Sequence, residues 1–403
     1  ENNASGRLLQ RIDYANFDSY GNAREINIYD NNRTIRVQLA YTSATNFAFP
    51  STQTLSVTNV DGTADTFSRQ YSYDIRTGDL TQYTDGKGYI TSYQYDNLGR
   101  IKKVIHPGNA SIQFVYDDFN NTLKSIDETG VINITKWNPL GWRIDEGIEV
   151  DNQYKSKAKY GYDSLGRLIW EEDALGHRTS YSYDSWDRQI QTTYADQSYE
   201  TITYDDISLT KTVTDPEGEA VRETYDIFDR LTKWEELTSN SNIVRQYTYD
   251  YRDNIVTQIE DNQSTIYTYD ALSRLTSVRT ANNEVTQYSY DLLGNLVTIT
   301  FPDNKTKANR YDELGRLIET TDANGKKEKF YYDRNDNLER MIDRNGKQFT
   351  YVYTNRNFLW KRTAPDGTIE YLYDDAGRRI TMKDQGCTQD GVPVPVCTTQ
   401  YVY

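Results

Sequence analysis

The chain has 403 residues, and its 60 acidic residues outnumber 45 basic ones, giving a formal net charge of −15. This acidity argues against a nucleic-acid partner, because such binding depends on clustered lysine and arginine. Tyrosine dominates the apolar composition, with 36 tyrosines against 11 phenylalanines. So many aromatic residues argue against disorder, and no apolar run is long enough for a membrane-spanning helix. We expect an acidic scaffold built on tyrosine.

The amino-terminal stretch, residues 1–70, is irregular. Phe17-Asp18 and Tyr29-Asp30 resemble degenerate copies of a pair that becomes regular later, and Asp61-Gly62-Thr63 marks a turn. No signal peptide is visible from Glu1 onward, so we expect any export signal to be removed or to lie outside this chain. We interpret residues 1–70 as divergent repeats.

Residues 71–380 carry a tyrosine–aspartate pair that recurs about every 21 residues, the mark of a repeat architecture. Tyrosines two positions apart, as in Tyr71 and Tyr73, place two rings on one face of a strand. Four residues after the paired tyrosine comes Gly, or a substitute that includes Asn120 and Ser208, which we expect to adopt the left-handed turn conformation. The residues predicted to build the scaffold are Tyr73, Asp74, Tyr95, Asp96, Gly99, Tyr162, Asp163, Gly166, Tyr183, Tyr249, Tyr269, Tyr290, Gly294, Tyr311, Gly315, Tyr332, Tyr373 and Gly377.

A second turn closes each unit about ten residues further on, as in Asp215-Pro216-Glu217-Gly218. One repeat is therefore two strands and two tight turns. No stretch shows the 3.6-residue apolar period and the capping residues that a helix needs. The sequence predicts an all-β, antiparallel β-hairpin repeat array.

The carboxy-terminal stretch, residues 381–403, interrupts the rhythm. We interpret it as a loop insertion followed by the start of a further, truncated repeat, because the chain stops at Tyr401-Val402-Tyr403 where an aspartate is due. Cys387 and Cys397 lie in this stretch. Two alternatives stay open for them, a disulfide across a hairpin in an oxidising compartment and a pair of free thiols in a loop.

So many consecutive strands cannot form one flat sheet, because twist makes open sheets of more than about ten strands curl, split or close. We expect the hairpin array to spiral into a curved strip or a partial hollow shell. We also expect ladders of stacked tyrosine rings to hold its wall together.

The Tyr-Asp-x-x-Gly-Arg-Leu pattern, in phase across fifteen copies, resembles the YD/RHS repeat family. It is most similar to the repeat shell of bacterial polymorphic toxins, including wall-associated contact-inhibition proteins. The resemblance implies a secreted or surface-associated shell segment that encapsulates and helps deliver a toxin domain outside this chain. The implied partners are the rest of a longer chain, with its toxin domain and shell plugs.

Residue chemistry gives little support for an enzyme. His106 and His177 both sit at turns and are expected to be solvated, and no serine or threonine has a phased histidine partner. We predict no catalytic residue, no cofactor and no metal site in this segment. The alternative function is adhesion, in which tyrosine-rich faces bind a cell-surface glycan or receptor, although wall packing is the favoured role for the tyrosines.

Overall fold

The structure is a computed structural model that describes residues 11–30, 33–43, 47–237, 243–385, 388–389, 392–393 and 396–402. Within these ranges it contains 37 β-strands, of which 35 belong to one sheet, and it has no α-helix. In the described part of the chain there is accordingly no helix that is long and apolar enough to cross a membrane. The predicted all-β, antiparallel β-hairpin array is confirmed.

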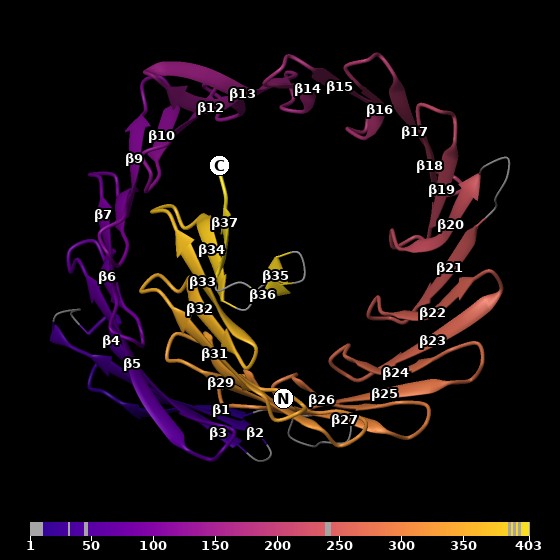
Figure 1. Cartoon of the computed structure of the whole chain (residues 1–403). Coiled ribbons are helices and arrows are strands. Elements are labelled where there is room, and N and C mark those ends of the chain that lie inside the picture. The colour runs from indigo at the N-terminus through magenta and orange to yellow at the C-terminus, as the bar shows by residue number, and fades with distance from the viewer. Residues whose placement is uncertain are drawn as a thin grey trace. The chain divides into compact units, whose positions relative to one another are not determined.

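The chain packs as two compact units. Their strands are labelled in Figure 1. The first unit comprises residues 1–114, 126–130 and 288–403. Its strands are β1 (Arg11–Phe17), β2 (Ala23–Asp30), β3 (Arg33–Tyr41), β4 (Pro50–Thr58), β5 (Ala64–Tyr73), β6 (Leu80–Thr84), β7 (Ile90–Tyr95), β8 (Ile101–Ile105), β26 (Leu296–Thr300), β27 (Thr306–Tyr311), β28 (Leu317–Thr321), β29 (Lys327–Tyr332), β30 (Leu338–Ile342), β31 (Gln348–Tyr353), β32 (Leu359–Ala364), β33 (Gly367–Tyr373), β34 (Arg379–Gln385), β35 (Thr388–Gln389), β36 (Val392–Pro393) and β37 (Cys397–Gln400).

The second unit comprises residues 115–125 and 131–287. Its strands are β11 (Ile132–Trp137), β12 (Arg143–Val150), β13 (Gln153–Tyr162), β14 (Leu168–Asp173), β15 (Arg178–Tyr183), β16 (Gln189–Thr193), β17 (Tyr199–Asp205), β18 (Thr210–Thr214), β19 (Ala220–Tyr225), β20 (Leu231–Leu237), β21 (Val244–Tyr249), β22 (Ile255–Glu260), β23 (Gln263–Tyr269) and β24 (Leu275–Arg279). Strands β9 (Ser111–Asp117), β10 (Thr122–Ile126) and β25 (Val285–Tyr290) contain the unit boundaries. The sequence-based division at residues 70 and 380 stays a prediction.

The hairpin between β15 and β16 shows how the repeat sequence sets the local fold. Tyr183 pairs with Gln189, and the register shifts by one residue just before Tyr183. The Asp184 amide donates to the Arg188 carbonyl at 2.9 Å, and the Asp187 amide donates to the Asp184 carbonyl at 3.3 Å. This is a type I turn followed by a left-handed bulge residue, a common three-residue hairpin loop. It requires positive φ at its last position, which explains the glycine of the repeat.

Where glycine is replaced, the position of the left-handed residue depends on the loop. Asp187 and Asp253 occupy the glycine position with φ of 63° and 64°. The prediction for Asn120 and Ser208 is wrong, because the positive φ falls one residue later, at Asn121 (49°) and Leu209 (53°). In the second of these hairpins Asp205 pairs directly with Thr210, without a register shift. Its loop is therefore one residue longer.

The second turn of the repeat is also a hairpin loop. At Asp215-Pro216-Glu217-Gly218, the Gly218 amide donates to the Asp215 carbonyl at 3.1 Å, and the Asp215 amide donates to the Glu219 carbonyl at 2.9 Å. The Asp215 carboxylate accepts a further bond from the Glu219 amide at 2.8 Å. The Asp-Pro sequence is therefore part of a turn between β18 and β19.

The apolar core is small, because a single sheet layer leaves both of its faces accessible. Its centre is Leu55 and Val57 on β4 with Phe67 on β5, each only 4% exposed, and Val37 and Leu314 pack against them. At the carboxy-terminal end, β37 pairs with β34 and begins at Cys397. Cys387 lies outside the described residues, so the disulfide between the two cysteines stays a prediction.

Candidate functional site

In many repeats the tyrosine ties its hairpin to the preceding strand through its hydroxyl group, whereas the Tyr225 hydroxyl donates to Glu223 on its own strand. The Tyr183 hydroxyl donates to the carbonyl of Leu168 at 2.7 Å, and the Tyr249 hydroxyl donates to the carbonyl of Leu231 at 2.6 Å. The same bond to an earlier strand is made by Tyr95, Tyr204, Tyr269, Tyr311, Tyr332, Tyr353 and Tyr373. The tyrosine thus supplies both buried ring area and a donor to the main chain of its neighbour.

The aspartate of the pair organises its own turn. Asp163 Oδ1 accepts the amides of Leu165 and Arg167 at 2.9 and 3.0 Å, and Asp163 Oδ2 accepts Arg167 Nε at 2.7 Å. This pattern repeats at Asp96, Asp184, Asp226, Asp270 and Asp312. Both carboxylate oxygens therefore accept hydrogen bonds, one from the turn amides and the other from the arginine that follows the turn.

The arginine reaches forward to the next repeat. Arg316 Nη1 lies 2.8 Å from Asp336 Oδ1, and its guanidinium lies 4.8 Å from the ring centroid of Tyr332. Arg167 makes the same two contacts with the next repeat, and Arg230 does so as well. Asp187, Asp253 and Asp336, which replace the glycine, thus have a second role that their backbone conformation alone does not show. They accept the arginine of the preceding repeat.

Ring-on-ring contacts occur at a few places among the described residues, two of them where an aromatic residue replaces that arginine. Trp142 occupies the arginine position and makes a tilted ring contact with Tyr162, with centroids 5.5 Å apart, and Phe358 does the same with Tyr373 at 5.2 Å. At Arg167, Arg188, Arg230 and Arg316 the guanidinium covers the ring of the next tyrosine instead. The expected ladder of stacked rings is therefore not continuous among the described residues, because at these four repeats arginine lies between the tyrosines in place of ring-on-ring contact.

The remaining predicted scaffold residues occupy related positions. Tyr73 stacks on Phe49 at 4.9 Å, and the Asp74 carboxylate accepts the Arg76 amide at 2.9 Å. Tyr290 ends β25. The predicted turn glycines have positive φ, and they are Gly99, Gly166, Gly294, Gly315 and Gly377.

Within the first unit, hairpins about 250 residues apart in sequence meet at a charged seam. We use this name for the contacts of the Asp333–Asp336 turn with β5 and with the turn after β6. Arg334 Nη2 lies 2.9 Å from Asp65 Oδ1, and Lys87 Nζ lies 3.1 Å from Asp333 Oδ2. Arg69 Nη2 lies 2.9 Å from Asp336 Oδ2. Sequence reasoning did not find these pairs.

Gly86 is what allows this close approach. Its φ is not in the left-handed region, yet an added Cβ would collide with the Arg334 carbonyl oxygen and lie 2.8 Å from the Phe67 ring. The preceding repeat adds an apolar contact, because its turn residue Leu314 packs on the core. Leu165, at the equivalent turn position of another repeat, is 69% exposed. The seam therefore combines apolar packing with ion pairs.

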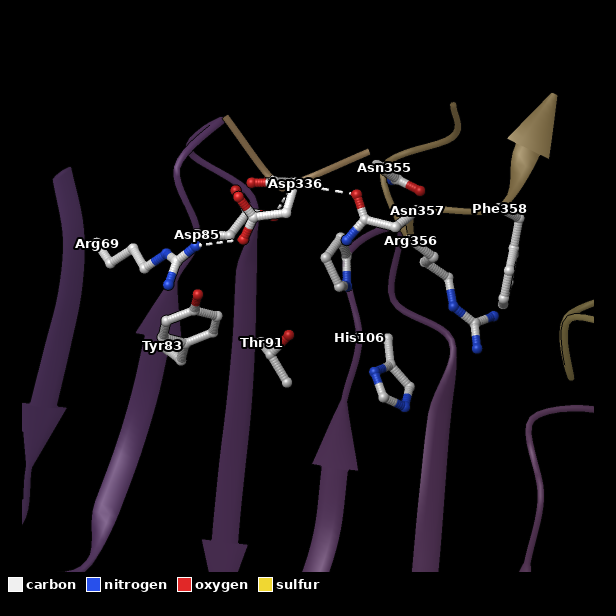
Figure 2. Close-up of a pocket in the computed structure, with 12 residues that line it drawn as sticks. Arg69, Tyr83, Asp85, Thr91, His106, Asp336, Asn355, Arg356, Asn357 and Phe358 are labelled. Atoms are coloured by element: carbon white, nitrogen blue, oxygen red, sulfur yellow. Dashed lines mark hydrogen bonds and ion pairs between the residues drawn. The ribbon is translucent and has the colours of Figure 1, made fainter. Parts of the chain in front are cut away.

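A cavity of about 440 Å³ lies beside the seam (Figure 2). One side is the sheet, with Tyr83 from β6, Thr91 from β7 and His106 directly after β8. The other side is formed by two turns of the later hairpins, which contribute Asp336, Asn355, Arg356, Asn357 and Phe358. Asn335 lines the cavity as well. Residues distant in sequence therefore share one polar and aromatic hollow.

The two histidines differ in environment. The expectation that both are solvated is right for His177, whose side chain is 62% exposed, and wrong for His106, at 27%. His106 Nε2 lies 3.5 Å from Glu128 Oε1, which Arg356 Nη2 approaches at 2.7 Å. Burial and the Arg356 charge lower the pKa of His106, against the opposing effect of Glu128. In the described part of the chain, no group of three or more His, Cys, Asp or Glu residues could hold a metal ion.

Comparison with known proteins places this repeat chemistry in context. The Teneurin YD-shell family matches residues 14–200 and 190–389. The crystal structure of TcdB2-TccC3-TEV is similar with a TM-score of 0.64 at 15% identity, and that of TcdB2-TccC3-Cdc42 with 0.60 at 13%. Both alignments cover 98% of this chain and 26% of the other chain.

The Tc holotoxin pore of Photorhabdus luminescens is similar with a TM-score of 0.56 at 12% identity, over 93% of this chain and 24% of that one. At these identities the likeness concerns the fold, and this chain spans about a quarter of the length of the chains it resembles. A comparison with curated proteins finds no match. The family match extends over most of the sequence and agrees with the observed hairpin repeats, and the chain therefore belongs to the Teneurin YD-shell family.

Proposed function

We propose that this chain is a non-catalytic β-shell segment of a secreted RHS/YD-repeat toxin, where it encapsulates a toxin domain carried elsewhere in a longer protein and helps to deliver it. The observation that carries the proposal is the repeated junction of tyrosine hydroxyl, aspartate and arginine. Each junction needs only the neighbouring repeat, as in other repeat proteins. A wall of this kind can be extended around a large space without a deep core.

The similar structures support a place in a toxin. They are Tc toxin components, and the chain corresponds to about a quarter of each. The toxin domain and the parts that close the shell would belong to the remaining length of the parent protein. The chain would then be exported with that protein, and a secreted or cell-wall-associated location follows from the same proposal.

The chemistry of the aspartates supports a structural role. The carboxylate of Asp226 accepts the amides of Phe228 and Arg230, and its second oxygen accepts Arg230 Nε. The hydrogen bond from Arg230 lowers the pKa of this carboxyl group despite the opposing effect of burial. A carboxylate held ionised by its own turn is poorly suited to donate a proton as a general acid.

Protection from protease in the full-length parent protein tests the proposal. We expect the toxin domain to resist proteolysis while the shell is intact and to become cleavable in Gly86→Ala, which forces the seam apart. Gly88→Asn, in the same turn, has nothing near its Cβ position and is the matched control. Its φ of 88° strains any side chain, asparagine least of all, so this variant should lose a little stability and still protect the toxin domain. A parent protein without a further domain, or a toxin domain cleaved equally in all three proteins, would refute encapsulation.

A further inference from the structure

One junction in the second unit lacks the arginine that links neighbouring repeats. In the hairpin of β15 and β16, the Asp184 amide donates to the carbonyl of Arg188, the linking arginine. In the next hairpin, formed by β17 and β18, the residue that pairs with Asp205 is Thr210. Thr210 therefore takes the place of the arginine. Its hydroxyl lies 3.1 Å from the hydroxyl of Ser208 in its own loop, and the side chain carries no charge.

The groups that hold an arginine in other repeats are nevertheless all present at this junction. Arg230, in the following repeat, shows what these groups are. Its guanidinium is bound by Asp226 of its own turn at 2.8 Å and by the left-handed Asp253 of the next repeat at 2.9 Å, and it covers the next tyrosine ring, that of Tyr249, at 4.9 Å. The corresponding groups at the junction without arginine are Asp205, Asp229 and Tyr225.

Among the described residues, none of these three groups has a cation as its partner. The carboxylate of Asp229, at a left-handed position with φ of 59°, makes no hydrogen bond and no ion pair. The carboxylate of Asp205 accepts hydrogen bonds within its own loop, including one from the Ile207 amide at 2.9 Å, and makes no ion pair. No guanidinium or ammonium group covers the ring of Tyr225.

A cavity of about 300 Å³ lies at this junction, and Asp205, Tyr225 and Asp229 all line it together with Thr210. Its volume is at the lower end of the range for ligand sites, which are typically lined by aromatic groups with a few convergent polar ones. The cavity therefore brings together the three groups that bind a guanidinium elsewhere in the chain.

Two cationic side chains also line the cavity, and each is bound to another acidic residue. Arg188 Nη1 lies 2.6 Å from Asp206 Oδ1, and Lys211 Nζ lies 3.0 Å from Glu223 Oε2. The carboxylates that these cations leave without a counterion are those of Asp205 and Asp229. The cavity therefore favours a cationic ligand.

We propose that this cavity binds a guanidinium group carried by another molecule. The planar cation would lie over the ring of Tyr225 and bind the carboxylates of Asp205 and Asp229, in the manner of Arg230 in the following repeat. The ligand is therefore a substituted guanidine, either a free small molecule or the arginine side chain of a polypeptide. This inference is independent of the encapsulation role, because it depends on one junction only.

Calorimetric titration of the 403-residue chain with N-butylguanidinium tests the proposal. N-Butylurea has a similar shape without the charge, and n-butylammonium has the charge without the planar fork. Asp229→Asn removes one carboxylate and should weaken binding of N-butylguanidinium about fivefold, the equivalent of one exposed ion pair. Asp253→Asn is the matched control, because Asp253 holds the same left-handed position but is already paired with Arg230.

Thr210→Arg supplies the missing guanidinium from the chain itself. This variant should no longer bind N-butylguanidinium, and its melting temperature should rise because the junction is completed. A capped tripeptide with a central arginine separates the two sources of ligand. If the tripeptide displaces N-butylguanidinium, the site accepts an arginine side chain, and if it does not, the site is restricted to a free guanidine; both results support a guanidinium site.

The proposal is supported if N-butylguanidinium binds more tightly than both comparators, is weakened in Asp229→Asn and is unaffected in Asp253→Asn, with the native circular-dichroism spectrum kept in all variants. Absence of binding overturns it. Equal affinity for N-butylurea or for n-butylammonium overturns the ligand class. Equal weakening in Asp229→Asn and Asp253→Asn, or binding that persists in Thr210→Arg, overturns the site.

Discussion

Arg316 is the best place to measure what one repeat junction contributes. Its side chain is only 12% exposed and that of Asp312 is 2% exposed, with Nε and Oδ2 2.7 Å apart. The same guanidinium reaches Asp336 at 2.8 Å and covers the Tyr332 ring at 4.8 Å. Arg316→Ala would leave the Asp312 carboxylate buried without its main cationic partner.

We expect this substitution to lower the free energy of unfolding by about 3 kcal/mol. This loss is at the low end of the range for breaking a buried ion pair, because the Asp312 carboxylate still accepts hydrogen bonds from the amides of Leu314 and residue 316. Arg378 provides the matched control. It makes the same 2.7 Å contact with Asp374, but its side chain is 41% exposed, so Arg378→Ala should cost about 1 kcal/mol or less.

Urea unfolding, followed by far-ultraviolet circular dichroism and tryptophan fluorescence, measures both variants. Arg316→Lys should fall between the wild type and Arg316→Ala, because lysine keeps the charge but loses the planar fork that reaches two aspartates. Equal losses for Arg316→Ala and Arg378→Ala would refute the argument, since burial and the bridge to the next repeat would then contribute nothing.

Three further predictions follow from single contacts. Gly86→Ala should destabilise the protein by about 2 kcal/mol through overpacking, and Gly88→Asn, which strains only the left-handed backbone at φ 88°, should cost about 1 kcal/mol or less; equal thermal melting points for the two would contradict the seam. Tyr249→Phe should cost about 1 kcal/mol in urea unfolding for the lost hydroxyl bond, whereas Tyr251→Phe, at an 83% exposed residue, should cost nothing measurable. The pKa of His106 is lowered in the folded protein, so the unfolded chain binds the proton first as the pH falls through about 6.5, and stability is lost below that value. His106→Asn should reduce this acid sensitivity in melting curves, and unchanged sensitivity would remove His106 as its source.

The local fold was predictable because the repeat encodes it locally. Strand period, turn glycines and the Asp-Pro turn at Asp215 all depend on residues within one hairpin. The ion pair of Asp336 could not be predicted from the residues of its own hairpin. A left-handed aspartate is expected from its conformational tolerance alone, but its pairing with Arg316 depends on the neighbouring repeat. The same is true of the one-residue shift at Asn121, where loop length and not residue preference decides.

The seam and its cavity could not be predicted from one hairpin or from two adjacent ones. Lys87 and Asp333 are separated by 246 positions, and nothing in either turn distinguishes it from an exposed one. Gly86 was the available signal. The turn needs a glycine only at Gly88, where φ is positive, and Gly86 lies two residues before it. A second glycine that the turn itself does not require indicates that another backbone approaches closely. His106 was misread for the same reason, because its partners Glu128 and Arg356 are distant in sequence.

Zero-length carbodiimide cross-linking followed by peptide mass spectrometry tests the central claim most directly, since the reagent joins an amine only to a carboxylate in contact with it. Lys87 Nζ and Asp333 Oδ2 are 3.1 Å apart across the seam, and Lys124 Nζ and Glu149 Oε2, at 2.7 Å, provide a control pair within the second unit. The structure predicts both cross-links in the monomeric protein, with the first abolished in Asp333→Asn. Recovery of the Lys124–Glu149 link without any Lys87–Asp333 link would show that the distant hairpins do not meet.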